Sequence, residues 1–166
     1  MTAVTYAYYL SPIGALVIGA SGEGIAVIRA AASGEEALPA ASSPLLLDCM
    51  RWLDAYFAGG NALPDLPLAE RGTPFERAVW AQLRSIPLGE TRTYDQIAAA
   101  LGRPGASRAV GRACGANPLL ILTPCHRVLG SGGKLTGFAA GLDMKRALLA
   151  HEGHEIHADR IIKPAK

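Results

Sequence analysis

Short apolar runs in the first 30 residues predict three β-strands. The expected strands span 5–10, 15–20 and 25–30, where Tyr, Val and Ile are frequent. Ser11-Pro12 and the segment 21–24 separate these strands with turn-forming residues. Connections this short join antiparallel neighbours, so the pattern predicts an antiparallel meander.

Apolar residues at helical spacing follow this region. They predict a helix over 44–58, which Gly59-Gly60 ends. The next segment, 61–72, contains two prolines and is typical of a linker. We therefore place a domain boundary near Gly72.

Two capping boxes mark helix starts beyond this boundary. In the first, Thr73 is the N-cap, Pro74 occupies the first helical position and Glu76 lies three residues after the cap. The second begins at Thr93 and predicts a short helix through Leu101.

A further helix is predicted over 106–115, after a turn that contains Gly and Pro. Two short helices joined in this way suggest a helix-turn-helix. Apart from Arg108 and Arg112, the second helix consists mostly of small residues. Small residues allow a close approach to a partner, and two arginines one turn apart can contact phosphates. The same composition suits a helix packed closely against the core, and the pattern alone does not separate the two.

An apolar run at 119–122 has the length of a buried strand, and we expect one there. After a proline, the chain continues with Cys125, His126 and Arg127. A rigidly held thiol becomes a nucleophile as a thiolate, although a buried cysteine is more commonly a small apolar residue. In extended backbone, neighbouring side chains point to opposite sides, so His126 would reach the sulfur only around a turn or through a water. Glu152 is the candidate for orienting the imidazole.

The last third of the chain predicts a loop, a helix and a tail. Residues 134–141 hold Phe138 between small residues and predict a loop able to close over a pocket. A helix is expected over 142–152, with Gly153 at its end. The segment 154–166 is polar, and we expect it to be poorly ordered. The nearby histidines stand three apart but match no zinc-ligand spacing, so we expect no metal site.

Composition indicates a globular protein, since 50% of the 166 residues are hydrophobic and 18% are charged. Three widely spaced cysteines without a CxxC pattern argue against a disulfide framework and favour the cytoplasm. The apolar N-terminal residues lack a basic leader and are interrupted early. We therefore expect neither a signal peptide nor a membrane span.

The charges are unevenly distributed, although the net charge is only +2. No acidic residue lies between Asp95 and Asp143. The basic residues of that interval are Arg103, Arg108, Arg112, Arg127 and Lys134. Positive charge around the candidate nucleophile fits an anionic substrate or nucleic acid. Chance clustering in a chain with few charges is the alternative.

The sequence Pro124-Cys125-His126-Arg127-Val128 resembles the O6-alkylguanine-DNA alkyltransferases, also called methylated-DNA–protein-cysteine methyltransferases. Supporting motifs follow in matching order: Thr73-Pro74-Phe75, Gly89, Tyr94, Ser107-Arg108-Ala109-Val110-Gly111, Asn117-Pro118 and His151-Glu152-Gly153-His154. The first 60 residues match more weakly, through 9–14.

The resemblance implies an α/β (α+β) fold with two domains and a tail. Residues 1–72 would form a small ribonuclease H-like domain, with an antiparallel sheet, a helix and the linker. Residues 73–154 would form a mostly helical, winged-helix-like domain that contains the helix-turn-helix and the active site. Residues 155–166 would be the C-terminal tail.

The resemblance also implies a function: the protein flips O6-alkylguanine out of duplex DNA and transfers the alkyl group irreversibly to Cys125, once per molecule. O4-alkylthymine would be a poorer substrate. His126 would act as base through a water, oriented by Glu152, and Asn117 would hold the turns around the site together. Tyr94 would help turn out the nucleotide and give the guanine a proton or hydrogen bond.

Further residues receive implied roles in binding. The helix-turn-helix would dock in the minor groove, where Arg108 would fill the space left by the nucleotide. The neighbouring DNA contacts would come from Ser107, Ala109 and Arg112, and the pocket from Cys114, Val128, Phe138 and Ala139. The implied partner is double-stranded DNA carrying O6-alkylguanine. The protein would act as a monomer, with cooperativity on DNA left open, and without a membrane, metal or cofactor.

Three departures leave the accepted alkyl size open. Phe138 stands where many relatives carry Tyr, Ala139 where Ser is common, and Cys114 where a larger side chain can occur. Two other functions stay under consideration. A non-catalytic helix-turn-helix DNA- or lesion-binding protein would not need Cys125. A cysteine hydrolase would leave the positively charged interval without a purpose.

Overall fold

The computed structural model describes residues 2–166 and separates into two compact units. The first unit runs up to Arg71 and includes Pro118–Leu120. The second contains Gly72–Asn117 and Ile121–Lys166. Among residues 2–166, none of the helices combines the length and the hydrophobicity that spanning a membrane requires.

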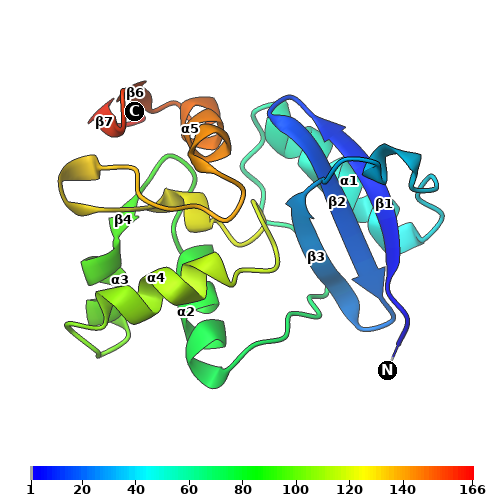
Figure 1. Ribbon diagram of the computed structural model, residues 1–166, viewed down its shortest axis with the longest axis horizontal. Coiled ribbons are helices and arrows are strands. Elements are labelled where there is room, and N and C mark those ends of the chain that lie inside the picture. The colour runs from blue at the N-terminus through cyan, green and yellow to red at the C-terminus, as the bar shows by residue number, and fades with distance from the viewer. Residues whose placement is uncertain (1) are drawn as a thin grey trace. The chain divides into compact units, whose positions relative to one another are not determined.

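The first unit is an antiparallel sheet covered on one face by a helix (Figure 1). Strands β1 (Thr5–Ser11), β2 (Gly14–Ser21) and β3 (Gly24–Ala30) pair in the order β1-β2-β3, and α1 (Pro44–Phe57) packs against all three. The predicted strands and helix are confirmed. The buried side chains of α1 recur at helical spacing, as its apolar pattern requires: Leu46, Cys49, Leu53 and Tyr56.

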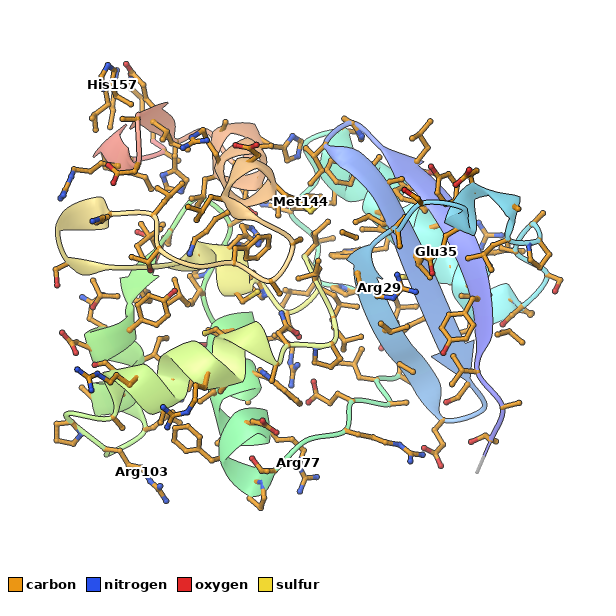
Figure 2. The ribbon with its side chains drawn as sticks, in the orientation of Figure 1. Arg29, Glu35, Arg77, Arg103, Met144 and His157 are labelled. Atoms are coloured by element: carbon orange, nitrogen blue, oxygen red, sulfur yellow. The ribbon has the colours of Figure 1, made fainter. Side chains whose placement is uncertain are left out.

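An ion pair shapes the loop after the sheet. Arg29 on β3 donates hydrogen bonds of 2.8 and 2.6 Å to the two carboxylate oxygens of Glu35, in the short 3-10 helix η1 (Glu35–Ala37) (Figure 2). The backbone N–H of Ala32 donates to the same carboxylate. These contacts hold the start of the loop against β3.

The second unit is mainly helical. Its helices are α2 (Pro74–Arg84), α3 (Tyr94–Ala100), α4 (Ser107–Gly115) and α5 (Leu142–His151), with 3-10 turns η2 (Cys125–Arg127) and η3 (Ser131–Gly133). Its strands are β4 (Arg92–Thr93), β5 (Val128–Leu129), β6 (Glu155–His157) and β7 (Arg160–Lys163). Both predicted capping boxes are confirmed, at Thr73 and Thr93. Helix α4 packs against α2 and α3, as a helix-turn-helix requires (Figure 1).

The strand predicted at 119–122 is wrong. Leu119 forms a single bridge to Ile28, and the chain then turns. Ile121 has a φ of 70°, a left-handed conformation that β-branched residues rarely adopt and that a strand cannot contain. All four side chains of the run are nevertheless buried. The apolar run therefore predicted correctly that these side chains are buried, but a buried segment need not have an extended backbone.

The prediction that residues 154–166 form a poorly ordered tail is also wrong, because β6 and β7 pair as an antiparallel hairpin. Its Ile156 and Ile161 pack against a buried cluster formed by Leu129, Leu135 and Leu149. His154 is buried as well, and its Nδ1 accepts a hydrogen bond of 3.1 Å from the N–H of Ala165. The segment has three isoleucines, Ile156, Ile161 and Ile162, too few for a periodicity signal, yet the two that pack against the cluster suffice to dock the hairpin.

Candidate functional site

A tight turn presents Cys125. The carbonyl oxygen of Thr123 accepts hydrogen bonds from the N–H of Cys125 at 2.8 Å and from Nδ2 of Asn117 at 2.7 Å. The N–H of Arg127 donates to the carbonyl of Pro124 at 3.0 Å, which closes the 3-10 turn. Cys125 and His126 therefore lie on a turn, but within the described residues Nδ1 of the His126 imidazole makes no hydrogen bond.

Two further contacts bring helices to this turn. Strands β4 and β5 pair in parallel, with Thr93 opposite Leu129, so the start of α3 lies beside the segment that follows Cys125. On α2, Nε1 of Trp80 donates a hydrogen bond of 2.8 Å to the carbonyl of Ala113 and so fixes α4. Residues distant in sequence thereby converge on one site.

A pocket of about 540 Å³ opens at this convergence. Its size is within the usual range for small-molecule sites. Helices α3 and α4 contribute Tyr94, Ser107, Arg108, Gly111, Cys114 and Gly115, and the remaining wall consists of Cys125, Thr136, Gly137, Phe138 and Ala139. Cys125 is only 3% exposed, so a substrate must enter the pocket to reach its sulfur.

The Cys125 thiol is protonated at rest. Burial raises its pKa to about 11, against the opposing effects of a hydrogen bond from Asn117 and the positive charge of Lys145. The second thiol of the pocket, Cys114, has a pKa raised to about 12 by burial. Because the thiolate is the nucleophile, attack from Cys125 requires a group that accepts the thiol proton.

His126 is placed to accept a proton. Its fully buried imidazole places Nε2 at 2.7 Å from Oε1 of Glu152. Beside a carboxylate, Nε2 carries the proton and Nδ1 is the acceptor. Nδ1 is buried and makes no hydrogen bond within the described residues. Burial lowers the pKa of His126, although Glu152 opposes this shift, so the imidazole is neutral at pH 7.

Arg127 is a structural tie. Its Nε donates to Oε2 of Glu152 at 2.9 Å, and its two terminal nitrogens donate to Oε1 of Glu152 at 2.8 Å and to the carbonyl of Ile86 at 2.7 Å. Burial opposes ionisation of Glu152, but His126 and Arg127 together hold its pKa well below the usual range. Arg127 is buried and its guanidinium is already paired with Glu152, which argues against a contact between Arg127 and a DNA phosphate.

The exposed face of α4 carries both of its arginines, Arg108 and Arg112. At the start of this helix, the hydroxyl of Ser107 donates a hydrogen bond to the carboxylate of Asp95. The interval without acids in the sequence therefore lies close to an acid in space. In the preceding turn, Arg103 stacks over the ring of Phe75, with its guanidinium carbon 5.4 Å from the ring centroid.

The predicted site residues fall into three groups. Those in the pocket wall are Tyr94, Ser107, Arg108, Cys114, Cys125, Phe138 and Ala139. Those behind the wall are buried: Asn117, His126, Val128 and Glu152. Ala109 and Arg112 lie on α4 outside the pocket lining. Val128 is buried and is not among the residues that line the pocket.

Sequence reasoning missed two residues, Thr136 and Lys145. The hydroxyl of Thr136 donates to the Tyr94 hydroxyl at 3.2 Å, which leaves the Tyr94 proton available for another acceptor. Burial raises the pKa of Tyr94, so this phenol stays neutral. Lys145 is completely buried. The signal for it was present, because Leu148 and Leu149 follow at helical spacing and place Lys145 on the buried face of α5.

The fold and site together define a helix-turn-helix protein with a buried thiol and a histidine–glutamate pair. Within the described part of the chain, no cluster of three or more His, Cys, Asp or Glu side chains could hold a metal ion. Residues 74–154 match the DNA binding domain of 6-O-methylguanine DNA methyltransferase, and residues 4–69 match the ribonuclease-like domain of the same family. The chain belongs to the 6-O-methylguanine DNA methyltransferase family.

Individual relatives agree over most of the chain. The methylated-DNA–protein-cysteine methyltransferase of Methanosarcina acetivorans is 44% identical over 153 residues, which cover 89% of this chain and 97% of the relative. The crystal structure of Mycobacterium tuberculosis O6-methylguanine methyltransferase has a TM-score of 0.80 at 41% identity and covers 95% of this chain and 97% of that chain. The crystal structure of Mycobacterium tuberculosis OGT in complex with DNA has a TM-score of 0.79 at 42% identity. The match covers 89% of this chain and 92% of that chain.

Proposed function

We propose that this protein repairs O6-alkylguanine in duplex DNA by moving the alkyl group irreversibly to its own Cys125, with O4-alkylthymine as a poorer substrate. Membership of the family makes it a methylated-DNA–protein-cysteine methyltransferase, and the proposal concerns how this chain performs that reaction. One observation carries it: the Cys125 side chain is 3% exposed and lines a pocket whose wall includes the first turn of α4.

DNA would approach along α4, the second helix of the helix-turn-helix. Its small residues allow the backbone to come close to a minor groove, and its exposed Arg108 and Arg112 suit phosphates and the base stack. An alkyl group on a stacked base cannot reach a sulfur that is 3% exposed, so the nucleotide must be flipped out. Arg108 would hold the vacated space, and Ser107 and Ala109 would lie against the backbone.

The transfer itself is a displacement at the alkyl carbon. The sulfur–carbon bond forms as the bond from carbon to O6 breaks, and guanine leaves restored. The proton of Cys125 would pass through a water to Nδ1 of His126, which Glu152 orients through Nε2. Tyr94 would donate its proton or a hydrogen bond to the leaving guanine, which is consistent with its neutral phenol.

The walls of the pocket would set the accepted alkyl size. Phe138 and Ala139 come from the loop predicted to close over the pocket, and Cys114 faces it from α4. Backbone groups of Cys125 and Ala139 would recognise the guanine edges. The carbonyl of Val128 already accepts a hydrogen bond from Lys145, so its contribution to the guanine contact would be shared.

Intact-mass measurement tests this proposal. After incubation with a duplex that contains one O6-methylguanine, we expect each protein molecule to gain the mass of one methylene group, located on Cys125 by peptide mapping. An undamaged duplex is the control. Binding to the damaged duplex without any mass gain would favour the alternative, a non-catalytic DNA- or lesion-binding protein. Repeated turnover would contradict a single-use acceptor.

The Arg108→Ala variant should separate flipping from chemistry. We expect repair of duplex DNA to slow by at least about tenfold, because one contact that holds the extruded state is lost. Reaction with free O6-methylguanine base should change little, since a free base needs no flipping. The matched control is Arg77→Ala, an arginine on α2 outside the pocket lining. Equal losses on both substrates would contradict the role of Arg108 in the base stack.

A further inference from the structure

The turn that carries Cys125 is tied to the end of α2 on both sides of the cysteine. Before the cysteine, the Thr123 hydroxyl accepts a hydrogen bond of 2.8 Å from Nη1 of Arg84, the last residue of α2. After the cysteine, Nη1 of Arg127 donates to the carbonyl of Ile86 at 2.7 Å. The end of α2 therefore holds the turn at two points, one on each side of the nucleophile.

Thr123 is the residue at which these contacts meet. It is 0% exposed, and a buried hydroxyl needs a hydrogen-bond partner, which Arg84 supplies. The carbonyl oxygen of Thr123 accepts hydrogen bonds from the N–H of Cys125 at 2.8 Å and from Nδ2 of Asn117 at 2.7 Å. A displacement of Thr123 would therefore move the backbone of Cys125 with it.

Helix α2 also holds the helix that is proposed to meet DNA. One turn before Arg84, Nε1 of Trp80 donates a hydrogen bond of 2.8 Å to the carbonyl of Ala113 on α4. Hydrogen bonds from one helix thus reach both α4 and the Cys125 turn. Because sites built on helices are held more precisely than sites on loops, α2 is placed to set the position of the sulfur relative to a base delivered by α4.

We infer that Arg84, acting through the Thr123 hydroxyl, is a positioning residue for the transfer reaction. The inference rests on the proposed function and adds to it the contact that fixes the attacking sulfur. Displacement requires the sulfur, the alkyl carbon and O6 to lie in line, and an error of about 1 Å in placement can slow a reaction about 100-fold. Neither Arg84 nor Thr123 lines the pocket, so both act through the turn and not by touching the substrate.

Two substitutions of Thr123 separate the effect of its hydroxyl from the effect of its shape. Thr123→Val keeps the shape and removes the hydroxyl, whereas Thr123→Ser keeps the hydroxyl and removes a methyl group. With a saturating O6-methylguanine duplex, we expect single-turnover transfer to slow about tenfold in Thr123→Val and to stay close to the native rate in Thr123→Ser. The duplex concentration that gives the half-maximal rate should not change, because α4 is untouched.

The control is Thr5→Val, the same change on β1 of the first unit, where the Thr5 hydroxyl donates to the carbonyl of Ala20 at 3.3 Å. This variant should transfer at the native rate. Native transfer in Thr123→Val, or slow transfer in Thr123→Ser with normal transfer in Thr123→Val, would overturn the inference, because the rate would then not follow the hydroxyl.

Arg84→Met tests whether the two residues act through one contact. We expect it to slow transfer, and adding Thr123→Val to Arg84→Met should slow transfer no further, because the hydrogen bond is already absent. Losses that multiply in the double variant would contradict a shared contact. Arg84 is only partly buried, so this variant also serves if Thr123→Val does not fold.

Amide hydrogen exchange tests the inference without any substrate. The N–H groups of Cys125 and Arg127 donate to the carbonyls of Thr123 and Pro124, and their exchange would be followed by NMR. Relative to the N–H groups of α5, we expect both to exchange about tenfold faster in Thr123→Val and in Arg84→Met, and at the native rate in Thr123→Ser. Unchanged exchange in Thr123→Val and Arg84→Met would overturn the positioning contact. Failure of the proposed function is separate, because it appears as absent methyl transfer by the native protein.

Discussion

Cys125→Ser should abolish alkyl transfer while leaving DNA binding intact. A serine hydroxyl keeps the size and hydrogen-bonding capacity of the thiol, but at neutral pH it ionises far less and is a much weaker nucleophile. We expect transfer from an O6-methylguanine duplex to fall by at least about 10⁴-fold. Affinity for the same duplex, measured by fluorescence anisotropy, should stay unchanged because α4 and its arginines are untouched.

The control for this variant is Cys49→Ala. Cys49 is also completely buried and its pKa is raised to about 12, but it lies on α1 in the first unit, away from the pocket lining. Full transfer activity in Cys49→Ala, together with none in Cys125→Ser, assigns the reaction to one thiol. Residual stoichiometric transfer in Cys125→Ser would mean that another residue, Cys114 first of all, accepts the alkyl group.

Arg127→Met should be the most destabilising of the substitutions considered. The change removes three hydrogen bonds and leaves the Glu152 carboxylate buried beside His126 without its cation. Breaking a buried ion pair by removing one partner costs about 3–5 kcal/mol. The free energy of unfolding should fall by that amount. It would be measured by denaturant titration, with the fluorescence of Trp80 in the second unit as the signal.

The matched control is Arg51→Met. Arg51 pairs with Asp48 on α1, but the two side chains are 72% and 52% exposed, so the pair should contribute less than about 1 kcal/mol. The pH dependence gives a further check. The pKa of Glu152 is lowered in the folded protein. The ionised Glu152 carboxylate therefore stabilises the fold above the ordinary carboxyl pKa, and this stabilisation is lost as pH falls below that value. The difference in the free energy of unfolding between the native protein and Arg127→Met should therefore become smaller at acidic pH. Equal stability of Arg127→Met and Arg51→Met at neutral pH would contradict the buried tie.

Local patterns predicted most of the secondary structure because the physics that fixes it is local. The two capping boxes at Thr73 and Thr93 join residues three apart, and the helices begin where those side chains satisfy the first free N–H groups. The apolar stripe of α1 predicted its buried face for the same reason. Where the structure depended on distant contacts, prediction was wrong. The turn at Ile121 and the hairpin after His154 are examples.

The site followed the same division. From the sequence alone, the residues around Cys125 and the arginines of α4 indicated a nucleophile near a nucleic-acid surface. The motif Pro124-Cys125-His126-Arg127-Val128 gave the family resemblance. Both inferences depend only on residue types and their spacing in the chain. The tertiary structure decided which atoms meet. It assigned Arg127 to Glu152, joined the carbonyl of Val128 to Lys145, and put Asp95 beside Ser107. It also brought Lys145 from α5 to the pocket. Such assignments follow from the packing of segments far apart in the chain, which no local pattern encodes.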